Sequence, residues 1–250
     1  MSFMRHRRLD RIRAALPTFC AVAVGLAGLL VSQAAYPARP MITDDARVVD
    51  AKSCQVETWI QKNRGSTEYW ALPACNFTGN LELTFGGGRT RDDTGERTTD
   101  VVFQGKTLFK TLEPNGWAVG LTFGNIRHPD VRSARGAVGD LYAYVPASFS
   151  FRDDRFVLHT NLGWLHEKEF GRHRMTWSVG SETQLGERIG LIAETFGQNR
   201  GKPSYQAGFR YWLVRDRVQI DTTYGNQFGS DTRARWFSIG LRLLSPVFLP

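Results

Sequence analysis

The sequence predicts an all-β protein: a transmembrane, antiparallel, up-and-down β-barrel of about twelve strands that follows a cleaved signal peptide. Three observations lead to this prediction. A basic and then apolar stretch opens the 250-residue chain, and apolar and polar residues alternate with period two through most of the remainder. The connections between these segments also alternate between long and short along the chain. We expect a signal peptide over 1–34, a periplasmic N-terminal segment over 35–53 and the barrel over 54–250.

The signal peptide is predicted from charge, hydrophobicity and residue size. Arginines crowd the first thirteen residues, and the uncharged run FCAVAVGLAGLLV follows at 19–31. Small residues at 32–34 form the pattern that signal peptidase reads, so we expect cleavage before Ala35. A membrane anchor needs about 20 apolar residues, and this run is shorter and ends in polar residues. The segment therefore indicates export.

Composition and charge exclude several classes of protein. Hydrophobic residues make up 42% of the chain and aromatic residues 12%, which argues against a disordered protein or a coiled coil. The net charge is +8, but the arginines of the first segment supply half of it, and both signs mix along the rest. A polyanion-binding surface would be more clustered, so we expect no nucleic-acid partner.

Period-two alternation is clearest in four segments, 81–86, 117–124, 205–212 and 236–243. The other candidate strands are 54–62, 67–75, 99–112, 139–152, 155–166, 174–184, 188–197 and 217–226. Such alternation fits either a soluble sandwich with its apolar face inside or a membrane barrel with its apolar face outside. Charged residues such as Glu82, Arg210 and Asp221 fall in mid-strand on one face, and the other face is continuously apolar. This contrast favours the barrel.

The connections support the barrel and orient it. Membrane barrels of this type have short periplasmic turns and longer external loops. The even-numbered connections are short, at 76–79, 113–115, 153–154, near 186 and at 215–216. Most odd-numbered ones are longer, at 89–98, 126–136, 167–173, 198–203 and 226–234, with 63–66 as the exception. We therefore expect the even-numbered turns at the periplasmic end.

Two cysteines, Cys54 and Cys75, follow the signal peptide, and an even pair suits an oxidising compartment. A four-residue loop at 63–66 sets Lys62 opposite Thr67, and the same register sets Cys54 opposite Cys75. Cross-strand neighbours are close enough for a disulfide. We predict a bridge that ties the first hairpin at its periplasmic end. The sequence shows no metal-ligand pattern around these cysteines.

Hairpin geometry also predicts which charged residues share the lumen. A turn at 215–216 sets Arg210 opposite Asp221, and a symmetric last loop puts Arg242 on the other side of Asp221. A loop centred on Glu96 sets Glu82 opposite Lys110. The full predicted lumen set is Glu82, Lys106, Lys110, His159, Glu182, Glu194, Arg210, Asp221 and Arg242.

These charges avoid the lipid face because Lys or Arg costs ~2–4 kcal/mol there at mid-membrane. Two roles stay open for them: a salt-bridge network that fills a narrow barrel, which we favour, and a charged constriction that selects solutes. Asp44 and Asp45 precede the first strand and are expected to enter the lumen as a plug, opposite inward basic residues.

One constellation raises the question of catalysis. A two-residue turn at Asp153-Asp154 sets Ser148 opposite His159, with Asn161 on the same face. Such a trio can act as nucleophile, base and orienting group. However, it falls in the lumen phase, and outer-membrane phospholipases need an active site that faces lipid. We therefore predict no catalytic residues, no cofactor and no metal.

Three stretches resemble a known family: RPMITDDARVVDAKSCQVETWIQ at 39–61, EYWALPACNFTGNLEL at 68–83 and GLRLLSPVFLP at 240–250. They are similar to proteobacterial outer-membrane barrels of the phenol-degradation meta-pathway type, often labelled "transporter". The resemblance implies an outer-membrane barrel that passes small molecules, without catalytic residues. The end of the chain departs from many barrels, because Pro246 stops the last strand and Phe248 lies beyond it.

Three functional classes remain. We favour a passive channel or facilitator for small molecules, with hydrophobic or aromatic ones among the candidates. A non-conducting structural or assembly-related barrel is the alternative, and an outer-membrane hydrolase is the least favoured. The expected partners are outer-membrane lipid, the barrel-assembly machinery and a small-molecule solute.

Overall fold

The computed structural model describes residues 41–131, 136, 138–230 and 234–250. These residues belong to one compact unit that spans 36–250. The expected signal peptide and its cleavage site lie outside the described residues. The described ranges contain no helix that is long and apolar enough to cross a membrane.

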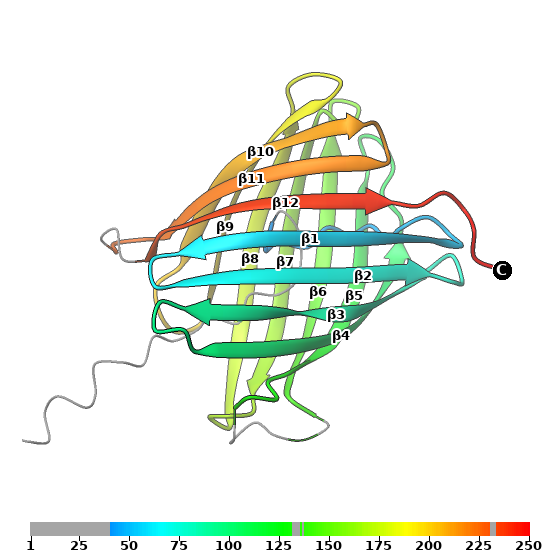
Figure 1. Cartoon of the computed structure of the whole chain (residues 1–250). Coiled ribbons are helices and arrows are strands. Elements are labelled where there is room, and N and C mark those ends of the chain that lie inside the picture. Colours follow the sequence, from blue (N-terminus) through cyan, green and yellow to red (C-terminus); the bar gives the residue numbers. More distant parts are fainter. Residues whose placement is uncertain (1–40, 132–135, 137, 231–233) are drawn as a thin grey trace, which may run out of the picture. The chain divides into compact units, whose positions relative to one another are not determined.

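Twelve antiparallel strands form a closed barrel, and each strand pairs with its neighbours in the sequence (Figure 1). Closure comes from β1, which pairs with both β2 and β12. The strands are β1 (Ser53–Asn63), β2 (Ser66–Asn76), β3 (Leu81–Asp92), β4 (Arg97–Lys110), β5 (Trp117–Arg127), β6 (Asp140–Phe151), β7 (Phe156–Glu167), β8 (Arg172–Gln184), β9 (Ile189–Gln198), β10 (Ser204–Val214), β11 (Val218–Gln227) and β12 (Trp236–Leu244).

The prediction of an up-and-down barrel with twelve strands is confirmed, and every expected segment overlaps one strand, with its ends within two residues inside or beyond the strand in several cases. Several strands run further into the odd-numbered connections than alternation indicated. The predicted loop at 89–98 shrinks to 93–96, because β3 continues to Asp92 and Asp92 N donates to Glu96 O at 3.0 Å. The two longest connections, 128–139 and 228–235, are both odd-numbered, as expected for external loops.

Apolar side chains point outward and polar ones inward along the strands. In β10, Phe209 is 50% exposed on the outer face, whereas its neighbour Gly208 is buried on the inner face. In β12, Ile239 is 53% exposed and Ser238 is buried. An apolar exterior around a closed, polar-lined barrel is the arrangement that lipid requires. The sandwich alternative is thereby excluded, since its apolar face would be the buried one.

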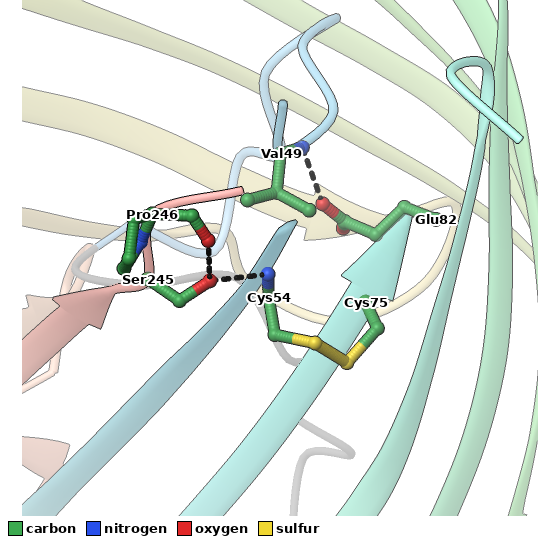
Figure 2. Close-up of a disulfide and its surroundings, with 6 residues drawn as sticks. All are labelled: Val49, Cys54, Cys75, Glu82, Ser245 and Pro246. Carbon is green, nitrogen blue, oxygen red and sulfur yellow. Dashed lines mark hydrogen bonds between the residues drawn. A yellow bond between two sulfur atoms is a disulfide. The ribbon is translucent and has the colours of Figure 1, made fainter. Parts of the chain in front are cut away.

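The predicted disulfide is present between Cys54 of β1 and Cys75 of β2, and the two residues are direct cross-strand partners with a Cα–Cα distance of 4.0 Å (Figure 2). Because the next residue, Gln55, points into the lumen, alternation puts the bridge on the outer face. The chain end is fixed beside it: Cys54 N donates to Ser245 Oγ at 2.8 Å, and Ser245 N donates to Cys54 O at 2.9 Å. As expected, β12 stops before Pro246.

Candidate functional site: the barrel lumen

The lumen contains the segment that precedes β1. We call residues 41–50 the inner segment. Met41, Ala46 and Val49 of this segment are buried, although no strand neighbours it in the hydrogen-bonded order of the sheet. Ala46 packs on Leu108 of β4 and Ala118 of β5 in a small apolar cluster. The expectation that Asp44 and Asp45 enter the lumen agrees with this placement.

Two lumen carboxylates bind backbone amides of the inner segment. Glu194 of β9 accepts hydrogen bonds from Ile42 N at 2.7 Å and from Thr43 N at 2.6 Å, and its Oε2 also accepts the Thr43 hydroxyl. On the other side of the barrel, Glu82 of β3 accepts a bond from Val49 N at 2.8 Å (Figure 2). A buried carboxylate is stable only when donors surround it, and the inner segment supplies them here.

Neutral wall side chains bind the remainder of this backbone. Asn161 of β7 accepts Asp44 N at 2.7 Å and donates to Asp44 O at 2.8 Å, which imitates the paired bonds of a strand. Ser148 of β6 accepts Ala46 N at 2.8 Å. The inner segment is therefore bound at intervals from one side of the lumen to the other.

Lys106 of β4 lies at the centre of a cluster of charged side chains. Its Nζ lies 3.0 Å from Asp44 Oδ1, 3.7 Å from Asp45 Oδ1 and 4.0 Å from Glu82 Oε1. The hydroxyl of Tyr144 donates to the other oxygen of Asp44 at 2.8 Å. Lys106 thus compensates carboxylates of both the wall and the inner segment.

A second charged group surrounds Glu182 of β8. Arg210 Nη1 lies 2.8 Å from Glu182 Oε1, and Arg47 Nη1 of the inner segment lies 3.6 Å from Oε2. His159 Nε2 is 3.6 Å from Glu182 Oε1. Arg210 is the register partner of Asp221, as predicted, and its guanidinium also forms the ion pair with Glu182.

Two predicted neighbours are wrong. Arg242 is the partner of Gln219, and Asp221 is opposite Gly240, because the last hairpin is offset by two residues from the symmetric closure. The expected Arg-Asp-Arg ladder is therefore absent. Arg242 still points inward, and its side chain lies 3.5 Å from Glu57 and donates to Gln55.

Lys110 is the second correction. The residue opposite Glu82 is Lys106, since the turn between β3 and β4 is centred nearer the N-terminus than Glu96. A register irregularity between Leu108 and Lys110 then changes the side to which Lys110 points. Its Nζ lies 4.3 Å from the centroid of Trp117, which is 47% exposed on the outer face. Lys110 is therefore no part of the lumen cluster.

The Ser148 and His159 pair forms as predicted. Ser148 Oγ lies 2.8 Å from His159 Nδ1, and both residues are fully buried. The third partner is Glu182 at 3.6 Å, whereas Asn161 binds the inner segment. Because Ser148 Oγ also accepts Ala46 N, the inner segment covers the hydroxyl. In this arrangement Ser148 and Asn161 hold the inner segment, and the fully buried Ser148 is closed to a substrate.

Sequence reasoning missed several lumen residues that contact the inner segment. Tyr144 and Asn76 fall in the inward phase but carry no charge, so nothing in a charge-based search selects them. The importance of Gly180 in β8 can be recognised only from the structure. A Cβ atom built on Gly180 would collide with Met41 Cε and would lie 3.1 Å from Thr43 Cβ.

At the start of the long connection 128–139, His128 joins two strands. Its Nδ1 lies 2.6 Å from Asp100 Oδ1 of β4, and its Nε2 lies 3.4 Å from Asp140 Oδ2 of β6. The hydrogen bond to Asp100, followed by that to Asp140, raises the pKa of His128 to about 10. A charged imidazolium therefore ties the two strands where the long connection begins.

Little free space remains beside the inner segment. The cavity that Asp44, Lys106, Glu57 and Arg242 help to line has a volume of about 50 Å³. A wider recess of about 390 Å³ opens beside Val48, Asp50 and Leu112, next to the even-numbered turns that contain Gly79 and Asp154. The cavity beside the Lys106 cluster is thus large enough for a few water molecules and too small for a larger solute.

The closed sheet, the apolar exterior and the charged interior define an outer-membrane β-barrel. The chain belongs to the family described as "Uncharacterised conserved protein UCP029691", whose model matches residues 25–244. This match does not name the phenol-degradation family that three stretches resemble, so that resemblance is supported only as far as the outer-membrane barrel.

Solved structures show the same fold at low sequence identity. A KdgM porin matches with a TM-score of 0.58 and 9% identity, over 76% of this chain and 98% of the porin. A NanC porin gives 0.56 and 8%, with the same coverage. The COG4313 outer membrane channel from Pseudomonas putida F1 gives 0.51 and 10%, over 80% of this chain and 97% of the channel. No curated protein matches the sequence.

Proposed function

We propose that this barrel is a channel for small polar molecules and that the inner segment is its movable plug. In the structure described above, this plug occupies the lumen. One observation carries the proposal: the inner segment fills the lumen and is held by hydrogen bonds and ion pairs to wall side chains, outside the paired strands of the sheet. Such contacts exchange readily for contacts with water.

The size and lining of the lumen support this function. The residual cavity of about 50 Å³ is too small for a solute, so transport requires the inner segment to move. Withdrawal would leave Lys106, Glu82, Glu194 and Arg210 along the pathway. Charged walls favour polar solutes, so we set aside the hydrophobic or aromatic solutes that were among the candidates from the sequence.

The similar folds agree with a channel. The matched structures are titled as porins and an outer membrane channel, and one is a KdgM porin in complex with disordered oligogalacturonate, a polar and acidic ligand. That complex has a TM-score of 0.54 and 11% identity to this chain. In this proposal, lumen basic residues such as Lys106 and Arg210 would meet an anionic solute.

Single-channel recording of the refolded, processed protein tests the proposal. Thr43→Cys with Gly180→Cys places two cysteines where Cβ atoms nearly meet, so oxidation should fix the inner segment to β8. We expect a silent oxidised variant and a conducting reduced one, with wild-type protein under the same reductant as control.

A filled lumen is also what a non-conducting structural barrel would show, and the same recordings separate the two functions. Silence of the wild type and of every variant would favour the structural barrel. A current that persists in the oxidised variant would mean that the inner segment is not the plug.

A further inference from the structure

The lumen recognises the inner segment chiefly through its backbone. Wall side chains bind five amide N–H groups and three carbonyls between residues 42 and 49. The N–H groups of Ile42, Thr43, Asp44, Ala46 and Val49 bind Glu194, Asn161, Ser148 and Glu82, and the carbonyls of Asp44, Asp45 and Val49 accept from Asn161, Lys106 and Asn76. Main-chain hydrogen bonds of this kind bind a peptide irrespective of most of its side chains.

A few side chains of the inner segment have their own places on the wall. Met41 lies over Gly180, where a side chain on the wall would displace it. Asp44 is held between Lys106 Nζ and the hydroxyl of Tyr144. Ala46 is fully buried, so a larger residue at this position would collide with its surroundings. These contacts give the site a preference for sequence.

The inner segment is joined to the barrel by a short, exposed turn. Asp50, Ala51 and Lys52 are exposed, and Lys52 has a φ of 59°, in the left-handed region. The contacts of residues 41–49 run to wall side chains. The turn is bound separately, since Lys52 N donates to Asn76 O and Lys52 O accepts from Phe248 N and Leu249 N. Cleavage of the turn would therefore leave the segment's contacts in place.

We propose that the lumen is a receptor site for a peptide without helix or strand, in which the inner segment is a tethered ligand that a peptide of the same kind can replace. The ligand follows the bent course of residues 41–50, with an acidic residue at the position of Asp44 and a small residue at that of Ala46. This proposal does not depend on conduction, because a barrel that never conducts could still bind such a peptide.

The experiment uses the full chain with a protease recognition sequence inserted between Asp50 and Ala51. The protein is folded first, and cleavage then releases the tether without changing the wall. We expect the cleaved fragment to co-purify with the barrel. A large excess of a fluorescent synthetic peptide with the sequence of residues 35–50 should then replace it, and unlabelled peptide should compete.

Controls test recognition. A peptide with Asp44→Lys puts a cation against Lys106, and it should be captured at least tenfold less, as should a scrambled peptide. In the barrel, Gly180→Leu should reduce capture at least tenfold. Gly190→Ala is the matched control, because a Cβ there meets only Thr183 O, at 3.6 Å.

The proposal is overturned if the fragment leaves on cleavage and no peptide is captured, or if scrambled and native peptides are captured equally. Hydrogen exchange of residues 41–50 in uncleaved protein gives an independent reading. Gly180→Leu should accelerate this exchange and Gly190→Ala should not, and equal rates in the two variants would also contradict the proposal. None of these readings involves current, so failure here is distinct from failure of the channel proposal.

Discussion

Replacement of Glu194 by alanine should loosen the inner segment more than any other single change in the wall. The carboxylate accepts three hydrogen bonds from this segment, from Ile42 N, Thr43 N and the Thr43 hydroxyl, at 2.6–2.7 Å. A hydrogen bond to a charged group contributes about 1.5–3 kcal/mol, but water replaces part of each bond when the segment leaves. We take on the order of 3 kcal/mol for the three bonds, which corresponds to a change on the order of 10²-fold in the population of the released segment.

Hydrogen exchange measured by mass spectrometry on a fragment that covers residues 41–50 gives this population directly. Exchange of the inner segment should accelerate on the order of 10²-fold in Glu194→Ala, by the conversion above. Glu57→Ala is the matched control, since Glu57 is also an inward carboxylate and its ion-pair partner is the wall residue Arg242. Unchanged exchange in Glu194→Ala, or equal acceleration in both variants, would refute the assignment of Glu194 as the principal anchor.

Three further outcomes are expected. Phe209→Arg puts a charge on the lipid face, next to the inward Arg210, and should cost about 2–4 kcal/mol of unfolding free energy in lipid vesicles, whereas Phe209→Leu should cost far less; equal costs would contradict the outward orientation. The double variant Cys54→Ser/Cys75→Ser opens a loop with a sequence separation of 21, and denaturant unfolding should show a loss of about 3 kcal/mol in unfolding free energy. A loss that differs from that of reduced wild-type protein would point to a packing defect instead. Because the folded-state pKa of His128 is about 10, above its usual value of about 6.5, its stabilisation is complete below about pH 6.5 and disappears as the pH rises through about 10. NMR titration of the imidazole should show this midpoint in wild type and a lower one in Asp100→Asn, and an ordinary midpoint in wild type would disprove the bridge.

Local rules were sufficient to predict the strands and the first hairpin. Side chains alternate strictly between the two faces of a strand. The adjacent residues Phe209 and Arg210 can therefore be assigned to opposite faces from the sequence. The short turn at 63–66 fixes the register from Lys62 to Cys54, and the disulfide follows from that register. Each of these inferences spans a single hairpin, where a short turn leaves few alternatives.

Register errors occurred where the chain between paired residues was long or irregular. The last connection is 228–235, and its asymmetry moved Arg242 two residues away from Asp221. A shift of two preserves the face, so Arg242 remains in the lumen. The irregularity beside Lys110 exchanges the faces, and period-two reasoning cannot detect it from the sequence.

The contacts of the inner segment were beyond sequence reasoning for a different reason. Asp44 and Asp45 could be assigned to the lumen from their position and charge. However, the anchors Glu194 and Asn161 lie more than a hundred residues away and recognise backbone, which every sequence has. The complementarity exists only after the barrel has closed and brought β6, β7 and β9 around one segment.

The wall and the inner segment complete each other's hydrogen bonding, and this limits how strongly the lumen is closed. With the segment in place, Glu194, Glu82 and Lys106 have partners although they are buried. Without it, the same groups would need water, and a lumen that admits water can supply it. Closure therefore exchanges hydrated charges for paired ones, and the net gain per contact is small compared with the gross energy of each bond. A plug held mainly by apolar packing would lack this compensation. In the two proposals above, the polar character of these contacts is therefore what would make the inner segment displaceable, by water in an open channel and by a peptide that offers the same backbone groups.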